Sequence, residues 1–218
     1  MAQQERRGKL VVISGFSGAG KGTMMRMLTE QDDNYVLSVS MTTRQPREGE
    51  VNGKDYFFVS NEEFEEAIRE NKLLEHAGYV DHYYGTPAAF VAQNRDNGKD
   101  VLLEIEVQGA MQVREKTDDA ILIFIMPPTA RDLLNRLVGR GSEDMGTITK
   151  RLEQALVEAS YMPKYDYIIV NDDLEKSTAL LDEVIQTEPD AYHYDAAQAE
   201  KFVGELKEII EELKGQAV

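Results

Sequence analysis

Residues Gly15 to Thr23 read G-F-S-G-A-G-K-G-T and directly follow an apolar run, Leu10 to Ile13, and Ser14. A buried strand that breaks into a glycine-rich turn before a helix is typical of a phosphate-binding loop, because glycines let successive backbone N–H groups point at one anion. The helix adds unpaired N–H groups and the positive end of its dipole. Lys21 supplies a mobile charge for the outer phosphates. This stretch, called the phosphate-binding loop below, predicts a nucleotide-binding protein.

The loop departs from the strict phosphate-binding pattern at one place. In G-x-x-x-x-G-K-[ST] a hydroxyl follows the lysine, whereas here Gly22 follows Lys21 and the hydroxyl comes one place later, at Thr23. That hydroxyl normally binds Mg²⁺, so we expect water and other groups to hold the metal here. A glycine-rich turn without chemical meaning is the alternative interpretation. The coincidence of glycines, lysine, hydroxyl and strand–helix context argues against it.

Composition limits the class of protein. The chain has 218 residues, no cysteine, 42% hydrophobic residues and a net charge of −16. That length suits one α/β domain with inserts, and no apolar stretch approaches the roughly 20 residues that a membrane helix needs. We expect no secretory signal, no disulfide and no thiolate metal site, and therefore a cytoplasmic protein. The acidic balance argues against nucleic acid as a partner, but not against nucleotides.

Continuous apolar runs alternate with helical patterns along most of the chain. Such runs are expected for parallel strands covered on both faces, and the alternation favours right-handed crossovers. The predicted fold class is α/β, a three-layer protein with a five-stranded parallel sheet. We predict strands at 10–14, 36–40, 100–104, 120–126 and 167–170, and helices at 22–30, 110–115, 129–137, 148–159 and 174–185.

Three stretches depart from this alternation. Residues 41–97 contain alternating, aromatic-rich pieces at 56–59 and 79–84, which favour a small antiparallel sheet with helices, inserted as its own mixed β/α lobe. Residues 136–148 carry three glycines and few apolar anchors, which is typical of a mobile flap between two helices. Residues 195–214 have the apolar spacing of an amphipathic helix, which either packs on its own domain or forms a dimer contact.

A second anion site is indicated by two arginines three residues apart. Arg44 and Arg47 flank Pro46, which stiffens the turn. Two planar guanidinium groups held close together suit the bidentate binding of a phosphate. Taken alone, such an arginine pair is usually solvated. Further along the chain, Thr86 before Pro87 has the alternative role of a helix N-cap.

The stretch from Thr42 to Val59 reads T-T-R-x-x-R-x-x-E-x-x-G-x-x-Y-x-F-V and strongly resembles the signature of guanylate kinases. The resemblance runs to about residue 187 and includes the phosphate-binding loop. Further matches are L-L-E at 73–75, Y-Y-G-T at 83–86, L-E-I-E-V-Q-G at 103–109, R-L-x-G-R-G at 136–141, K-R-L at 150–152 and V-N-D-D at 170–173. It implies a P-loop kinase core with a GMP-binding lobe and a short mobile lid.

The resemblance implies that GMP lies in the inserted lobe. It assigns the GMP phosphate to Ser40, Arg44, Arg47, Tyr56 and Tyr84, and the guanine base to Glu75 with Thr86 beside it and Glu106 nearby. Many members carry D-x-D where this chain has Glu104-Ile105-Glu106. The longer Glu104 side chain is expected to reach either the metal shell or an arginine of the GMP site.

The resemblance also implies that ATP and Mg²⁺ bind at the phosphate-binding loop. Arg140 and Arg151 match flap arginines that close over the ATP phosphates, and Arg136 is a weaker candidate; pairing with helix acids is their alternative role. Asn171 matches a residue near the adenine. The residues implied to be catalytic are Lys21, Arg44, Arg140 and Arg151, and those implied to bind ATP are Gly15, Ser17, Gly18, Ala19, Gly20, Lys21, Gly22, Thr23, Arg140 and Asn171.

The implied reaction is ATP + GMP → ADP + GDP, in purine nucleotide metabolism, with dGMP as an alternative acceptor. The implied domain spans 1–187, with its core at 8–40, 98–130 and 152–187, the GMP-binding lobe at 41–97, the lid at 131–151 and an acidic helical extension at 188–218. We expect a monomer or homodimer that binds neither nucleic acid nor membrane. The alternatives are a non-catalytic peptide-binding relative, a kinase for another phosphorylated acceptor, and a P-loop hydrolase or switch.

Overall fold

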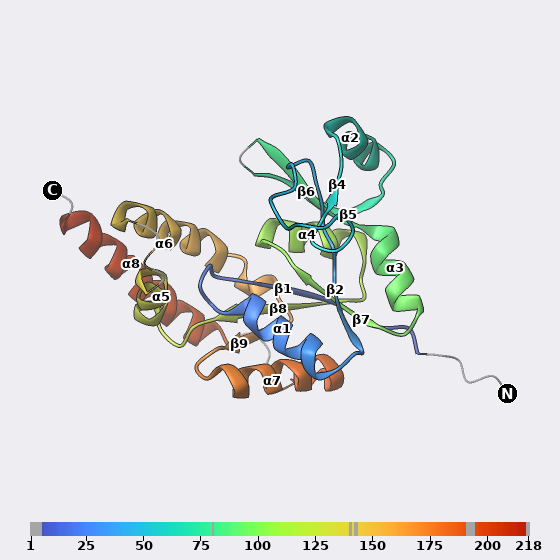
Figure 1. Cartoon of the computed structure of the whole chain (residues 1–218). Coiled ribbons are helices and arrows are strands. Elements are labelled where there is room, and N and C mark those ends of the chain that lie inside the picture. The colour runs from blue at the N-terminus through green and yellow to red at the C-terminus, as the bar shows by residue number, and fades with distance from the viewer. Residues whose placement is uncertain (1–5, 80, 140, 142–143, 191–194, 217–218) are drawn as a thin grey trace. The chain divides into compact units, whose positions relative to one another are not determined.

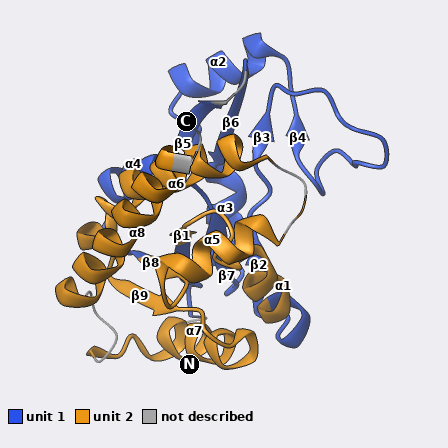
Figure 2. Ribbon diagram, turned by 90° about the vertical axis from the view of Figure 1, so that its left-hand side faces the viewer, with its two compact units in different colours: residues 1–12, 29–121 blue, residues 13–28, 122–218 orange. Residues whose placement is uncertain are grey.

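The computed structural model describes residues 6–79, 81–139, 141, 144–190 and 195–216. The chain divides into two compact units, which are coloured separately in Figure 2. Unit 1 consists of residues 1–12 and 29–121, and unit 2 of residues 13–28 and 122–218. Each unit is treated by itself below. Among the described residues, no helix has the length and apolar character that crossing a membrane requires.

The predicted parallel sheet is confirmed, with strand order β2-β7-β1-β8-β9. In unit 1, β2 pairs in parallel with β7, and in unit 2, β8 pairs in parallel with β9. Every residue of β8 is buried, as expected for a strand covered on both faces. The expected strand at 36–40 is shorter and begins one residue earlier. The strands are β1 (Leu10–Gly15), β2 (Tyr35–Leu37), β7 (Asp100–Glu104), β8 (Ala120–Met126) and β9 (Tyr167–Val170).

Unit 1 contains a second sheet, with order β4-β3-β6-β5. The predicted antiparallel pairing is confirmed for β3–β6 and β5–β6, whereas β3 and β4 pair in parallel, so the sheet is mixed. In the aromatic piece at 79–84, Tyr79 ends one strand and residues 82–84 belong to the next, which pairs with it antiparallel. The strands are β3 (Met41–Thr42), β4 (Phe57–Phe58), β5 (Leu73–Tyr79) and β6 (His82–Pro87).

Three helices lie wholly in unit 1: α2 (Asn61–Arg69), α3 (Ala88–Asp96) and α4 (Val107–Lys116). Helix α2 begins with a capping box, since Ser60 accepts from the Glu63 N–H and the Glu63 carboxylate accepts from the Ser60 N–H. Its Phe64 is buried in a small core with Ala67 and Leu73. The N-cap role considered for Thr86 is wrong, because Pro87 is the N-cap residue of α3.

The helices of unit 2 are α5 (Ala130–Val138), α6 (Met145–Ala159), α7 (Leu174–Thr187) and α8 (Ala196–Gln216), with a short 3₁₀ turn at Met162–Lys164. Helix α1 (Lys21–Gln31) starts in unit 2 and ends in unit 1. Side-chain N-caps start α5 at Thr129, α6 at Asp144 and α7 at Asp173.

In unit 2, the predicted flap needs correction, and the predicted packing of the C-terminal helix gains support. The predicted flap at 136–148 is too long, because residues 136–138 belong to α5 and residues 145–148 to α6. Helix α8 packs against α5 and α6, and the three lie side by side in Figure 1. Its apolar residues Phe202, Leu206, Ile209 and Ile210 are buried. This burial favours packing on its own unit over a dimer contact.

Candidate active site

The phosphate-binding loop joins β1 to α1, as predicted. Gly18 and Gly20 have positive φ values of 94° and 96°, which side chains rarely adopt. A Cβ atom on Gly20 would lie 2.5 Å from Nδ2 of Asn171, so the close approach also demands glycine. Lys21 Nζ donates to the carbonyl oxygens of Gly15 at 2.7 Å and Phe16 at 3.1 Å. The lysine therefore lies against the backbone of the loop that carries it.

Two side chains outside the loop hold its backbone in place. Asn171, which is buried, donates from Nδ2 to the Ala19 carbonyl at 2.7 Å. Arg136 donates to the carbonyl oxygens of Asn171 at 2.6 Å and Ala19 at 3.4 Å. Both side chains thus hold the backbone of the loop at Ala19. Their predicted contacts with adenine and with phosphate remain predictions.

One of the predicted flap arginines reaches the loop. Arg151, on α6, donates from Nη1 to the Ser17 hydroxyl at 3.0 Å. Its guanidinium group therefore lies at the loop where the ATP phosphates are expected. Arg140 lies outside the described residues.

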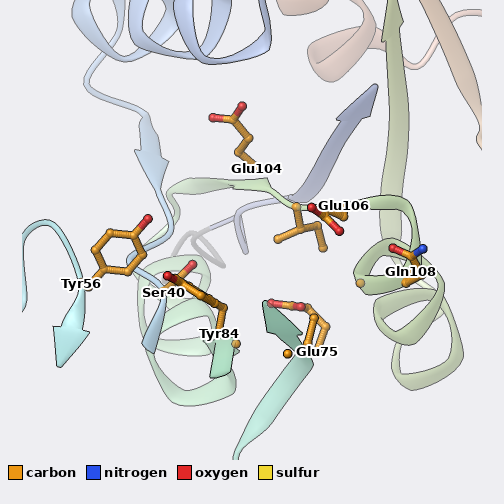
Figure 3. Close-up of a pocket in the computed structure, with 12 residues that line it drawn as sticks. Ser40, Tyr56, Glu75, Tyr84, Glu104, Glu106 and Gln108 are labelled. Carbon is orange, nitrogen blue, oxygen red and sulfur yellow. The ribbon is translucent and has the colours of Figure 1, made fainter. Parts of the chain in front are cut away.

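A cavity of about 360 Å³ lies within unit 1 (Figure 3). It is formed by the mixed sheet, the end of β7 and the start of α4. Gln108 and Gly109 form part of its wall. Six of the side chains assigned to GMP from the sequence also line it: Ser40, Tyr56, Glu75, Tyr84, Glu104 and Glu106. The structure thus brings together residues that are up to 66 positions apart in the sequence.

The buried acid of this cavity is Glu75, on β5, with 6% of its surface exposed. Thr86, whose hydroxyl was assigned alternatively to a helix cap, donates to Glu75 Oε1 at 2.6 Å. Burial raises the pKa of Glu75, while the Thr86 hydrogen bond and the charge of Lys116 oppose that rise. A cavity wall with one largely desolvated carboxylate is suited to a ligand that carries hydrogen-bond donors.

Helix α4 holds β5 in position next to Glu75. Gln112 accepts from the His76 N–H at 3.0 Å and donates to the His76 carbonyl at 2.9 Å. Lys116 donates to the Leu73 carbonyl at 2.8 Å. A Cβ atom on Gly109 would lie 2.9 Å from Glu75 Oε2, so a larger residue there would displace the Glu75 carboxylate. Sequence reasoning missed these three α4 residues, although their spacing of three and four places them on one helix face.

Arg44 is held by an acid that sequence reasoning also missed. Its Nη1 and Nη2 donate to the two carboxylate oxygens of Glu50, both at 2.9 Å, and Nη1 also donates to the Gln45 carbonyl. The guanidinium lies 5.3 Å from the Tyr56 ring centre and 5.7 Å from that of Phe58. Glu50 was visible in the signature, but nothing local in the sequence joins it to Arg44.

The charges in this turn stabilise one another. Glu50 also accepts from the backbone N–H of Arg47 at 2.7 Å. The hydrogen bond from Arg44, followed by that from Arg47, lowers the pKa of Glu50, and the Glu50 carboxylate raises the pKa of Arg44. Glu50 takes up Nη1 and one hydrogen of Nη2, and a hydrogen bond with the Tyr84 side chain also raises the pKa of Arg44. The Arg47 side chain is exposed.

The two lengthened acids lie at the cavity without a metal-ligand cluster. Glu104 is exposed at the end of β7, and Glu106 occupies the N-cap position of α4 without capping it by a side-chain hydrogen bond. Both line the cavity. Over the described ranges, no group of three or more acids and histidines is arranged to hold a metal ion.

The parallel sheet, the glycine loop with its lysine and the separate carboxylate-lined cavity define a P-loop nucleotide-binding protein of the α/β class. Comparison with known proteins narrows this class. The guanylate kinase family model matches residues 7–188. The chain belongs to the guanylate kinase family.

Curated relatives and a solved structure agree with this assignment. The chain is 47% identical over 203 residues to a guanylate kinase of Lactiplantibacillus plantarum, covering 93% of this chain and 98% of that one. It is 51% identical over 183 residues to a guanylate kinase of Streptococcus pneumoniae, covering 84% and 88%. The crystal structure of guanylate kinase from Anaplasma phagocytophilum matches with a TM-score of 0.65 at 34% identity, covering 95% of each chain. The recognition made from the sequence is therefore confirmed.

Proposed function

We propose that this enzyme transfers the γ-phosphoryl group of ATP to GMP or dGMP, giving ADP and the guanosine diphosphate. The observation that carries the proposal is the buried Glu75 carboxylate with its Thr86 partner in the cavity. Guanine offers adjacent N1–H and N2–H₂ donors, and one carboxylate accepts both. Adenine has no such pair, so AMP would leave a desolvated acid unpaired. Sites of this kind reject the analogue that lacks the donor by about 10⁴-fold or more.

The acceptor phosphate is assigned to the arginine-bearing turn. Arg44 and Arg47 supply the guanidinium groups, and Ser40, Tyr56 and Tyr84 supply hydroxyl donors. Glu104 and Glu106 line the same cavity. A phosphate held by two guanidinium groups is fixed in orientation as well as in position, which in-line transfer requires.

The donor nucleotide is assigned to the phosphate-binding loop. The backbone N–H groups of its glycines face the phosphates, and Lys21 leaves the loop carbonyls to bind them. Arg151 and Arg140 neutralise charge on the transferred group, and the lid at 131–151 closes over the ATP phosphates and excludes water. No residue is covalently modified, since placement and charge neutralisation carry most of the acceleration.

Mg²⁺ fits this donor site through phosphates and water. Mg²⁺ usually keeps several waters and binds through substrate phosphates, so it needs no cage of protein ligands. The glycine at position 22, where a metal-binding hydroxyl would otherwise stand, supports that mode. When bound next to Lys21, the ion would neutralise negative charge on the phosphates of the donor nucleotide. Thr23 is the nearest hydroxyl in the sequence to the missing ligand position.

The remaining assignments follow from the same proposal. We place the reaction in purine nucleotide metabolism in the cytoplasm, with neither nucleic acid nor membrane as partner. We also propose that the GMP-binding lobe spans 41–97 and the lid 131–151, with the core formed by the remaining residues of the domain. A monomer fits the burial of the α8 apolar face better than a dimer formed through it.

Initial rates of ADP release test the proposed function. We expect GMP and dGMP to support turnover, and AMP, CMP and UMP to give rates lower by about 10⁴-fold or more. ADP release without any acceptor would indicate a hydrolase, and equal rates with all four ribonucleotides would contradict the guanine site. No ADP release with any acceptor would favour the non-catalytic alternative.

Replacing Glu50 with glutamine will raise KM for GMP by about tenfold, because Arg44 loses its charged bidentate partner and is no longer held in one orientation. KM for ATP will stay within about twofold, as for ordinary surface changes. Glu48→Gln is the matched control, since Glu48 is an exposed acid in the same turn. Equal KM values for GMP in the two variants would refute the positioning role of Glu50.

A further inference from the structure

Helix α8 begins beyond the residues that the family model matches, yet it contacts the phosphate-binding loop. Phe202 of α8 stacks on Phe16 with ring centres 4.9 Å apart and planes within 6°. Both side chains are buried, with 2% and 0% of their surfaces exposed. Phe124 of β8 meets the Phe16 ring edge-on at 5.0 Å. The Phe16 side chain is therefore held between β8 and α8.

The backbone carbonyl of Phe16 accepts two hydrogen bonds within the phosphate-binding loop. It accepts from the Ala19 N–H at 3.0 Å and from Lys21 Nζ at 3.1 Å. The first bond closes the glycine turn, and the second holds the lysine that is assigned to the outer phosphates. A displacement of the Phe16 ring would therefore move the turn and the lysine together.

Helix α8 also contacts the two helices that supply arginines to the loop. Glu205 accepts from the Ala130 N–H at the start of α5, and α5 carries Arg136, which donates to the Ala19 carbonyl. Helix α6 carries Arg151, which donates to Ser17. Figure 1 shows α5 and α6 packed along α8.

The buried ring of Phe202 contributes more to the packing of α8 than its surface ion pairs do. The ion pairs Arg131–Glu212 and Lys214–Glu153 join α8 to α5 and α6, but all four side chains are about half exposed. Exposed ion pairs of this kind contribute little to the stability of the fold. Aromatic stacking in a filled core contributes more and also defines geometry.

We propose that α8 is a positioning element of the donor site, and that Phe202 is its positioning residue. By packing on Phe16, Phe202 holds the phosphate-binding loop and Lys21 in the arrangement that receives a nucleoside triphosphate. This inference rests on the proposed function, because it assumes that ATP binds at the loop. It gives the C-terminal helix a role in ATP binding.

The test is nucleotide binding by the full chain carrying Phe202→Leu. Leucine keeps an apolar side chain but removes the stacked ring, so Phe16 gains room to move. Binding of a fluorescent ATP analogue, measured by titration, will weaken by about tenfold, within the range found for substitutions that act on a site without contacting its ligand. GMP binding, measured by calorimetry, will stay within about twofold of wild type.

Phe64→Leu is the matched control. Phe64 is also fully buried and stacked, on Tyr83 at 5.4 Å, but it belongs to the small core of unit 1. We expect it to lower thermal stability by a similar amount without changing affinity for the ATP analogue. If Phe202→Leu does not fold, Phe202→Met replaces it, because the flexible thioether fills the space without stacking.

The outcomes separate this inference from the proposed function. Weakened ATP binding with unchanged GMP binding in a Phe202 variant, and unchanged ATP binding in Phe64→Leu, would support the positioning role. Wild-type ATP affinity in the Phe202 variants, or equal losses for both nucleotides, would overturn it and leave the proposed function standing. A wild-type protein that does not bind the ATP analogue would overturn both.

Discussion

Lys21→Ala will lower kcat by about 10²- to 10³-fold, the usual effect of removing one charge-stabilising donor from a transition state. The Lys21 ammonium is the cation that the phosphate-binding loop itself carries, and it rests on the Gly15 and Phe16 carbonyls. The phosphates of a bound ATP would offer Lys21 stronger, charge-assisted hydrogen bonds than those neutral carbonyls do. The measurement is single-turnover ADP formation at saturating GMP and ATP.

The variant is expected to remain folded. The variant loses two hydrogen bonds from the Lys21 ammonium group to carbonyl oxygens, which contribute about 1.5 to 3 kcal/mol each, and it creates no clash in the loop. Lys176→Ala, an exposed lysine of α7 in the same unit, is the control and should keep wild-type kcat. A Lys21→Ala protein with a normal melting temperature and near-normal kcat would refute the donor-site assignment.

Glu75→Gln will lower kcat/KM for GMP by about 10²- to 10³-fold, because a carboxylate that accepts two donors becomes an amide that accepts from one and repels the other. The substitution keeps the shape of the side chain, so the Thr86 hydroxyl retains an acceptor. Affinity for ATP should not change, since Glu75 lies in the cavity of unit 1 and not at the phosphate-binding loop. The measurement is kcat/KM for each nucleotide.

The same residue predicts a pH dependence. GMP binding needs the ionised carboxylate, and burial raises the pKa of Glu75 above its ordinary value of 4.5. kcat/KM for GMP in the wild type will therefore fall as the pH drops through that raised pKa. Glu75→Gln should lose this acid limb, whereas Glu66→Gln, an exposed acid of α2, should keep it. An unchanged acid limb in Glu75→Gln would show that another group titrates.

Features encoded by adjacent residues could be predicted from the sequence. The apolar run of β1, the glycines and Lys21 are contiguous, so both the strand and the loop were expected where they occur. The buried strands β7, β8 and β9 were found for the same reason, because each is a continuous apolar run. The signature from 42 to 59 identified the family because its residues also lie close together in the sequence.

Features that depend on distant partners could not be predicted. Gln112 holds the backbone of His76, 36 residues away, and Phe202 stacks on Phe16 from the far end of the chain. Thr86 shows how a local rule fails: a hydroxyl before proline suits a helix N-cap, but Pro87 is the N-cap of α3, and the Thr86 hydroxyl donates to the buried Glu75 carboxylate. The flap was predicted too long because the capping residue Asp144 starts α6 within it.

A crystal structure of the protein with GMP and a non-hydrolysable ATP analogue tests the central claim most directly. We expect the guanine N1–H and N2–H₂ groups on the Glu75 carboxylate, the monophosphate beside Arg44 and Arg47, and the triphosphate on the loop with Lys21. Electron density for the monophosphate at any other place, or for guanine away from Glu75, would contradict the assignment of this cavity as the acceptor site.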